Sequence, residues 1–308
     1  MKLKKIDIKK SINKGVKFLI KNQKEDGSLY LNNDTRWQVW ETANAYIAVN
    51  STDTKNKNFL DKSIEFLLDN QRDDGSFSHD VNFKKNHYCI ETTSVCLHAL
   101  SINKKDITKG INFIIEKQNS DGSWDIGTPE IIKYRRWPSV TGFALNILID
   151  YYSNKENITK GIEYILNSQL NDGSWGSKWI YYDTSYYTLY PILSSLKKSG
   201  HENSPNYNNA IQFIKNNQNS DGSWIENTTD KPKPSICLRT SLALCSLLIT
   251  PNQNNIYKIE KGIEYLINQQ ENEGYWDGGY FVNWPNKKED IYTTSMSINV
   301  LTKYLNSF

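Results

Sequence analysis

The chain contains few cysteines, little net charge and no long apolar run, and each of these absences excludes a class of protein. Four cysteines in 308 residues are few for the length, which is typical of free thiols in a reducing cytosol. A formal charge of +3 without a block of basic residues argues against a nucleic-acid partner. No apolar segment approaches the ~20 residues of a transmembrane helix, and the basic residues 1–20 have no uninterrupted apolar centre like that of a signal peptide. We therefore expect a cytoplasmic protein without a transmembrane segment.

A polar turn of the type Gln-x-x-Asp-Gly-Ser-Trp recurs six times along the chain. The copies begin at Gln23, Gln71, Gln118, Gln169, Gln218 and Gln270. Their period of about 50 residues indicates one repeated supersecondary unit. In each unit an amphipathic helix precedes the turn, and a second helix opens on a threonine after it. The Asp-Gly or Glu-Gly pair is expected to stop the first helix, because glycine readily adopts the left-handed conformation of a helix end.

The second helix of each unit is apolar on nearly every side, as in residues 141–150 and 240–249. Such a helix is enclosed by protein, whereas a one-faced amphipathic helix lies at the surface. Six such pairs predict an all-α fold, an (α/α)6 toroid with six inner helices inside six outer ones. An open superhelix of helical hairpins is the alternative. We expect one domain over residues 1–308, with repeats at about 8–52, 58–102, 107–152, 157–198, 206–250 and 257–306.

The tryptophans of the turn, Trp124, Trp175 and Trp224, are interpreted as structural residues. Six near-identical turns cannot all lie at one active site. We expect each indole to fill the gap between neighbouring repeats, with the amide of the glutamine packed against it.

The repeated turn resembles the repeat of the squalene cyclases and, more broadly, of the terpenoid cyclase and protein prenyltransferase superfamily, over essentially the whole chain. The resemblance implies a six-hairpin toroid, and the chain has the length for one. Prenyltransferase β-subunits bind zinc in a final segment that ends in D-x-Y-H-T. Residues 290–294 match this segment, except that Thr293 replaces the zinc-binding histidine, so we expect no metal and no other cofactor. A second set of potential ligands has a spacing that matches no compact zinc site and is interpreted as buried helix residues: His87, Cys89, Cys96 and His98.

The cyclase branch of the superfamily implies an acid that protonates an alkene or epoxide. That acid is the aspartate two residues before the threonine of D-x-D-D-T-A or D-C-T-A. The equivalent positions in this chain are Trp40, Glu91, Ser139, Tyr182, Leu238 and Tyr292. Glu91 is the one acid among them, and it lies in the second repeat, about where the motif falls in the catalytic barrel of squalene cyclases. We expect Glu91 to be the general acid, with Asp183 and Glu41 as further candidate catalytic carboxylates.

Aromatic residues and one arginine are expected at the same mouth of the barrel. Aromatic faces can stabilise a developing carbocation, and a cation at a helix N-terminus calls for an anionic partner or ligand. The candidate substrate-binding residues are Trp40, Tyr88, Trp137, Tyr182, Tyr186, Arg239 and Tyr292.

These residues favour a single-barrel, class II-like terpenoid cyclase, an isomerase or lyase acting on a small hydrophobic isoprenoid. One alternative is a toroid enzyme that acts on a glycan or peptide with paired carboxylates among Glu41, Glu91 and Asp183. Another is a toroid that binds a ligand or a protein partner without catalysis. A closed aromatic cavity would favour the first function, an open polar groove the second and a plugged barrel the third.

Overall fold

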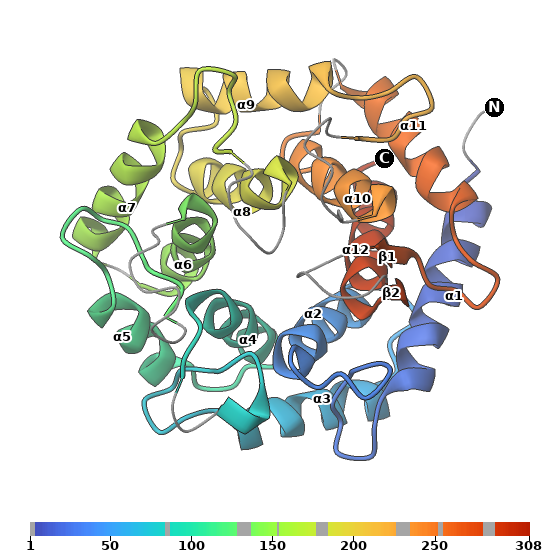
Figure 1. Ribbon diagram of the computed structural model, residues 1–308, viewed down its shortest axis with the longest axis horizontal. Coiled ribbons are helices and arrows are strands. Elements are labelled where there is room, and N and C mark those ends of the chain that lie inside the picture. The colour runs from blue at the N-terminus through green and yellow to red at the C-terminus, as the bar shows by residue number, and fades with distance from the viewer. Residues whose placement is uncertain are drawn as a thin grey trace.

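Two concentric rings of helices make up the molecule, as the computed structural model in Figure 1 shows. It describes residues 4–83, 87–127, 137–152, 154–176, 184–225, 235–251, 255–279 and 287–308. The outer helices are α1 (Lys5–Asn22), α3 (Lys57–Asn70), α5 (Thr108–Glu116), α7 (Lys155–Asn167), α9 (Pro205–Asn216) and α11 (Ile256–Asn268). The inner helices are α2 (Gln38–Ser51), α4 (Ile90–Ile102), α6 (Pro138–Tyr151), α8 (Ser185–Lys198), α10 (Ile236–Leu247) and α12 (Ile291–Ser307).

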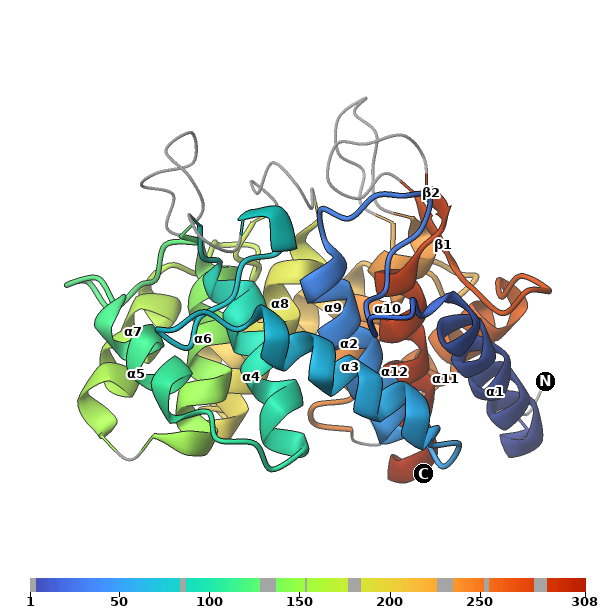
Figure 2. The same cartoon turned by 90° about the horizontal axis from the view of Figure 1, so that it is seen from below.

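The ring is closed, which confirms the predicted all-α toroid and not the open superhelix. α12 packs against both α10 and α2, and α1 packs against α11 and α12. The small elements are a 3-10 turn, η1 (Val81–Phe83), and an antiparallel hairpin of β1 (Asp277–Gly279) and β2 (Lys287–Glu289). Figure 2 shows this hairpin at the end of the barrel opposite the C-terminus.

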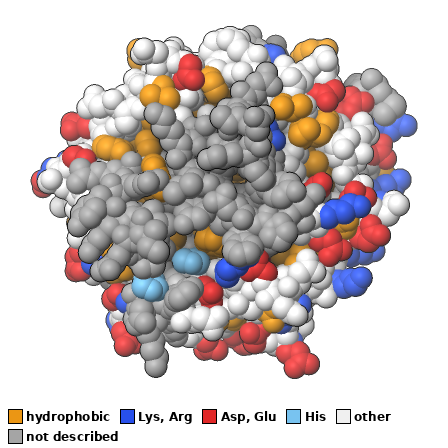
Figure 3. All heavy atoms as spheres, in the orientation of Figure 1, with side chains coloured by type: hydrophobic (Ala, Val, Ile, Leu, Met, Phe, Trp, Pro, Cys, Tyr) orange, Lys and Arg blue, Asp and Glu red, His pale blue; other side chains and the backbone are white. Residues whose placement is uncertain are grey.

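The burial of the helices follows the two kinds of helix seen in the sequence. In α10 every residue from Cys237 to Leu247 is buried, whereas α11 buries one face only, at Ile259, Gly262, Ile263 and Leu266. Around the rim of the face in Figure 3, acidic and basic side chains are interspersed. All four cysteines are unpaired thiols in the buried core.

Five of the turns join their own outer helix to the next one through the glutamine, at Gln23, Gln118, Gln169, Gln218 and Gln270. The Gln118 amide nitrogen donates to the carbonyl of Gly122 at 3.0 Å and to that of Asn157, in the next outer helix α7, at 2.8 Å. Asp121 accepts from the backbone N–H and the hydroxyl of Ser123, at 3.1 and 2.7 Å. The glutamine is therefore a hydrogen-bonded link between repeats.

The same link closes the ring between the last repeat and the first. Gln270 donates to the carbonyl of Ser11 in α1 at 2.9 Å, and the Ser11 hydroxyl donates back to its amide oxygen at 2.7 Å. Gly274 approaches α1 so closely that a Cβ there would lie 2.3 Å from the carbonyl oxygen of Lys14. The turn therefore requires glycine both for this approach and for its φ of +102°.

The glycine of the turn does not stop the outer helix, so that expectation was wrong. α1 ends at Asn22, and the following Gln23 is already extended at φ −66° and ψ 134°. Gly27 lies in a separate tight turn, in which its N–H donates to the carbonyl of Lys24 at 3.0 Å. The left-handed glycine thus shapes the turn after the helix has ended.

The tryptophans of the turn fill the space between repeats, as expected. The Trp124 side chain is fully buried, and its indole N–H donates to the carbonyl of Ile114 in α5 at 2.6 Å. Its ring lies against Gly161 of the next outer helix, where an added Cβ would come within 3.1 Å of it. Trp175, Trp224 and Trp276 make the same hydrogen bond to the carbonyl ten residues earlier.

The repeated threonine anchors the turn to the inner helix. Its hydroxyl oxygen accepts a backbone N–H of the turn, for instance Trp124 to Thr141 at 3.2 Å and Phe77 to Thr93 at 2.9 Å. These threonines lie in the first turn of their helices and do not open them: α6 begins at Pro138 and α4 at Ile90.

The fourth repeat has a different register from the one expected. Thr184 is the N-cap of α8, and the hydroxyl of Thr188, in the first turn, contacts the carbonyl of Gly176 at 3.4 Å. Thr184 therefore does not have the place in α8 that Thr141 has in α6. The place of Glu91 belongs to Tyr187 and not to Tyr182, because Tyr187 lies three and four residues before Tyr190 and Pro191 as Glu91 lies before Ser94 and Val95, and all four of these residues face the barrel interior.

Candidate functional site

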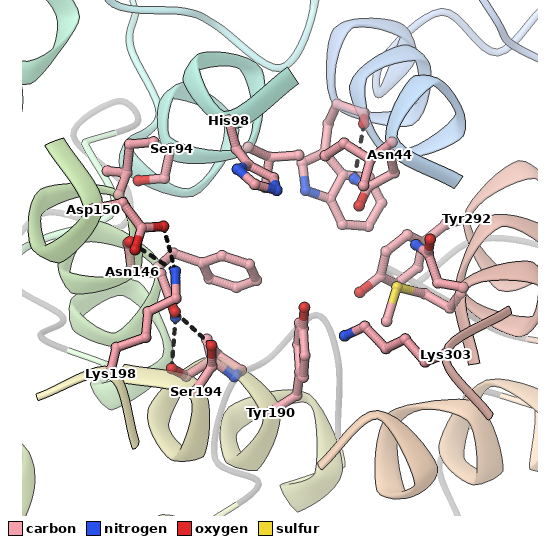
Figure 4. A pocket seen from close by; sticks show the side chains of 18 residues that line it. Asn44, Ser94, His98, Asn146, Asp150, Tyr190, Ser194, Lys198, Tyr292 and Lys303 are labelled. Carbon is pink, nitrogen blue, oxygen red and sulfur yellow. Dashed lines mark hydrogen bonds and ion pairs between the residues drawn. The ribbon is translucent and has the colours of Figure 1, made fainter. Parts of the chain in front are cut away.

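A cavity of about 180 Å³ lies inside the ring of inner helices (Figure 4). Its lining comes from five inner helices and follows helical spacing: Tyr292, Met296, Asn299 and Lys303 lie on one face of α12, and Ser94, Val95 and His98 on one face of α4. The wall of the cavity thus extends from the first turns of the inner helices to their last turns.

Glu91 lies on the same face of α4, three and four residues before Ser94 and Val95, and therefore faces the barrel interior. Its side chain is 2% exposed. One carboxyl oxygen accepts a hydrogen bond from the Ser139 hydroxyl at 3.2 Å, and the other accepts one from the Tyr187 hydroxyl at 3.1 Å. Three inner helices, α4, α6 and α8, thus hold this one carboxyl group.

Burial changes the protonation of Glu91. Loss of solvent raises the pKa of its carboxyl from 4.5 to about 7, although the hydrogen bonds from Tyr187 and Ser139 act in the opposite direction. At neutral pH about half of the molecules therefore carry the proton on this residue. A buried carboxylic acid of this kind can serve as a proton donor.

Aromatic side chains connect Glu91 to the cavity. The Tyr187 ring lies 5.7 Å from that of Phe143, and the Trp40 ring lies 4.0 Å from that of Tyr292, centroid to centroid. Phe143, Trp40 and Tyr292 all line the cavity. The charge of Glu91 contributes to the raised pKa of the Tyr292 phenol, although burial is the larger cause. The acid therefore lies next to the aromatic end of the cavity.

The other end of the cavity is polar. Lys198 pairs with Asp150 at 2.5 Å, and their side chains are 33% and 34% exposed. His98 and Lys303 also line the cavity, in the C-terminal halves of α4 and α12, and the charges of Lys198, Asp150 and Lys303 act on the His98 imidazole. Burial lowers the pKa of His98, so its imidazole is neutral at physiological pH. The electrostatic interaction with Tyr190 raises the pKa of Lys303, which keeps its ammonium charged.

The remaining candidate residues lie in several places. Glu41 and Arg239 are buried in the first turns of α2 and α10, and Trp137 is the partly buried N-cap of α6. Tyr182 and Asp183 lie outside the described residues.

Two predicted substrate-binding tyrosines point away from the cavity, and their expected role is corrected. Tyr186 is fully buried with its ring 6.3 Å from Phe213 of the outer helix α9. The Tyr88 ring lies 5.0 Å from Phe113 of the outer helix α5. Both rings pack between the two rings of helices.

Of the four residues expected to be buried in a helix, Cys96 is one, Cys89 is the buried N-cap of α4, His98 lines the cavity, and His87 lies partly buried before the helix, so that expectation was wrong for His87 and Cys89. The Asp290 carboxylate caps α12 by accepting the N–H of Thr293 at 2.6 Å, and the Cys89 sulfur accepts the N–H of Thr92 at 3.5 Å. In the ranges that the structure describes, no three His, Cys, Asp or Glu side chains gather as a metal site.

Sequence reasoning missed several residues of the cavity. They are Phe143, Asp150, Tyr190, Lys198 and Lys303. All of them lie one to three helical turns beyond the first-turn positions. Residues three and four apart along a helix share one face, so counting in such steps from the first-turn positions would have identified them.

A comparison of the sequence with profiles of known protein families finds one family that matches most of the chain. The family profile described as the squalene-hopene cyclase C-terminal domain matches residues 2–130 and 131–287. No curated protein sequence matches the chain. None of the helices in the described ranges combines the length and apolar character that a membrane crossing requires.

Solved structures share the fold at low sequence identity. A protein from Actinoplanes is 15% identical, with a TM-score of 0.77 over 96% of this chain and 99% of its own. A variant of the type II terpene cyclase MstE from Scytonema, in complex with its substrate geranylgeranyl dihydroxybenzoate, is 15% identical, with a TM-score of 0.74 over 99% of both chains. A possible member of the GH105 family from Salmonella enterica serovar Paratyphi A is 13% identical, with a TM-score of 0.69 over 100% of this chain and 96% of its own.

Proposed function

The chain belongs to the squalene-hopene cyclase C-terminal domain family, and from this premise we propose that it is a class II-like terpenoid cyclase. In this proposal it is an isomerase or lyase that protonates a small isoprenoid inside the barrel. The proposal is supported chiefly by the environment of Glu91. Its carboxyl group is buried beside an aromatic cavity and has a pKa of about 7.

Glu91 starts the reaction by transferring its proton to an alkene carbon of the substrate. The resulting tertiary cation is attacked by a second alkene of the same chain, so a carbon–carbon bond forms and a ring closes. The final cation loses a proton to water, which restores an alkene, and Glu91 regains a proton from solvent, so that the net reaction is an isomerisation. Ser139 and Tyr187 hold the carboxyl in position for the first step.

The cavity wall suits the cation that follows. Trp40, Phe143 and Tyr292 present aromatic rings to the cavity, and aromatic faces attract a cation, most strongly where water is excluded. The glycan alternative requires a second carboxylate at about 5–10 Å from the first. Proton donation to an alkene requires one carboxyl group that retains its proton, and the buried Glu91 with its two hydroxyl partners supplies such a group.

The proposal is tested by incubating the protein in deuterated water with linear prenyl diphosphates, prenyl carboxylates and polyprenes. Product that is isomeric with its substrate and carries one deuterium would show initiation by proton transfer. Glu91→Gln keeps the shape and removes the acid, so its rate should fall by about a hundredfold or more. Glu163→Gln, an exposed residue of α7, is the matched control and should retain the parent rate. Product from Glu91→Gln at the parent rate would reject this mechanism.

A further inference from the structure

The polar end of the cavity carries the Lys303 ammonium, which pairs with no acidic side chain of the described residues. Among the described residues, Lys198 is paired with Asp150, but no carboxylate lies within 4.0 Å of the Lys303 ammonium. Tyr190 lies beside it, with the Lys303 nitrogen 5.2 Å from the ring centroid. The neutral His98 adds no compensating charge. This end of the cavity therefore has a net positive charge.

The neighbouring side chains leave the Lys303 ammonium available. On the opposite wall, Asn146 donates to the carbonyl of Pro191 at 2.7 Å and accepts the hydroxyl of Ser194 at 2.6 Å. Lys198 also donates to the carbonyl of Asn146 at 3.2 Å. These groups satisfy one another within α6 and α8. Lys303 belongs to α12, is exposed to solvent and points into the cavity (Figure 4).

The cation and the acid lie at opposite ends of the cavity. Tyr292 lies in the first turn of α12 as Glu91 lies in that of α4, and Lys303 follows Tyr292 by eleven residues, which is about 16 Å along the helix axis. An isoprene unit has four carbon–carbon bonds of about 1.5 Å along its chain and advances about 5 Å when extended. The span therefore fits about three extended isoprene units, or four in a chain folded for ring closure.

We propose that the substrate is an isoprenoid of three or four units with an anionic head, a phosphate ester or a carboxylate, which binds Lys303 while the tail reaches Glu91. This inference rests on the proposed cyclase function for the role of Glu91, but the binding of the head does not depend on catalysis. Lys303 supplies the charge, and the exposed Lys198–Asp150 pair marks the end at which the head remains near solvent. A neutral polyprene would offer the Lys303 ammonium no anion, and Tyr190 would remain its neighbour in the cavity.

The test measures dissociation constants by titration calorimetry in the Glu91→Gln background, which prevents turnover. The probes are farnesyl diphosphate, farnesoic acid and farnesol, and the two anionic arms distinguish a phosphate head from a carboxylate head. Farnesol should bind at least about tenfold more weakly than the better anion, since a hydrogen bond to a charged group is worth about 1.5–3 kcal/mol. Added salt should weaken binding of the anions and not of farnesol.

Substitutions at one position assign the effect to Lys303. Lys303→Met should weaken anion binding about tenfold or more and leave farnesol binding unchanged, and Lys303→Arg should retain most of the affinity. Lys197→Met is the matched control, because Lys197 lies on α8 outside the cavity and donates to the carbonyl of Ile249. Equal binding of farnesol and the anions, unchanged anion binding in Lys303→Met, or no binding of any probe would overturn the inference.

The two proposals fail in different ways. Binding of an anion that depends on Lys303, without deuterated product in the parent protein, would leave this inference in place and reject the cyclase. Cyclisation of neutral polyprenes at the same rate in the parent and in Lys303→Met would support the cyclase and reject this inference.

Discussion

The free energy of unfolding should fall as the pH rises because of Glu91, and the substitution Glu91→Gln should reveal this dependence. The carboxyl has a pKa of 4.5 in an unfolded chain and about 7 in the folded protein, chiefly because folding removes it from water. Between these two values the folded state holds a proton that the unfolded state has released. Stability therefore falls as pH rises through this window, by about 1.4 kcal/mol per pH unit, and the total loss is about 3 kcal/mol.

Glu91→Gln should remove this dependence. The amide is neutral at every pH, and its oxygen and nitrogen can still hydrogen-bond to the hydroxyls of Ser139 and Tyr187. We expect the parent and the variant to have similar free energies of unfolding near pH 4.5. Above pH 7 the variant should be the more stable protein by about 3 kcal/mol.

Urea unfolding followed by circular dichroism, at pH values from 4.5 to 8, measures the difference directly. Glu163→Gln on the exposed surface of α7 controls for the loss of a glutamate as such. A difference between parent and Glu91→Gln that stays constant over this range would refute the reasoning. It would mean that Glu91 ionises in the folded protein as readily as in water, and the residue would then be a poor candidate for the acid.

Three further predictions concern the pH dependence of the reaction and the stability of the toroid. Product formation should decline as pH rises through about 7, because Glu91 must carry its proton; a rate that increases over this range would exclude it as the acid. Trp175→Ala should lower the free energy of unfolding by about 3–5 kcal/mol, and a variant that melts like the parent would exclude a structural role. Gly200→Ala should cost about 1–2 kcal/mol for its left-handed φ alone, since an added Cβ meets nothing within 4 Å. Gly222→Ala should cost clearly more in the same urea assay, because its Cβ would lie 2.3 Å from the carbonyl oxygen of the next outer helix.

The sequence was sufficient to predict the toroid because the repeated turn contains the contacts that build it. The glutamine spacing identified the unit, and in five of the turns the same glutamine links its outer helix to the next, including Gln270 to Ser11 across the closure. The end of the outer helix was misplaced because glycine in left-handed conformation serves equally in a helix cap and in a tight turn. In this protein Gly27 has its φ of +88° in the turn.

The site was harder to predict because it depends on how helices from different repeats meet. Glu91 could be identified by its position before Thr93, but nothing local indicated that Tyr187 would reach it from α8. In the fourth repeat the pattern pointed to Tyr182, two residues before Thr184, but Thr184 is the N-cap of α8. The place of Glu91 belongs to Tyr187, which precedes the cavity-lining Tyr190 and Pro191 by three and four residues. Leu189 stands where the other repeats have their threonine, so the repeated pattern could not reveal this position.

The position of Glu91 also explains how burial alone can keep one carboxyl protonated. In a carboxylate pair, mutual repulsion keeps one proton bound. For Glu91 the cause is burial, and among the described residues its oxygens accept hydrogen bonds from the hydroxyls of Ser139 and Tyr187. Such an acid remains protonated only while the barrel around it excludes water, and a bound hydrocarbon chain excludes water more completely than a sugar or a peptide. Substrate binding in the cavity should therefore raise the fraction of Glu91 that carries a proton, and an isoprenoid is the kind of substrate for which this arrangement is effective.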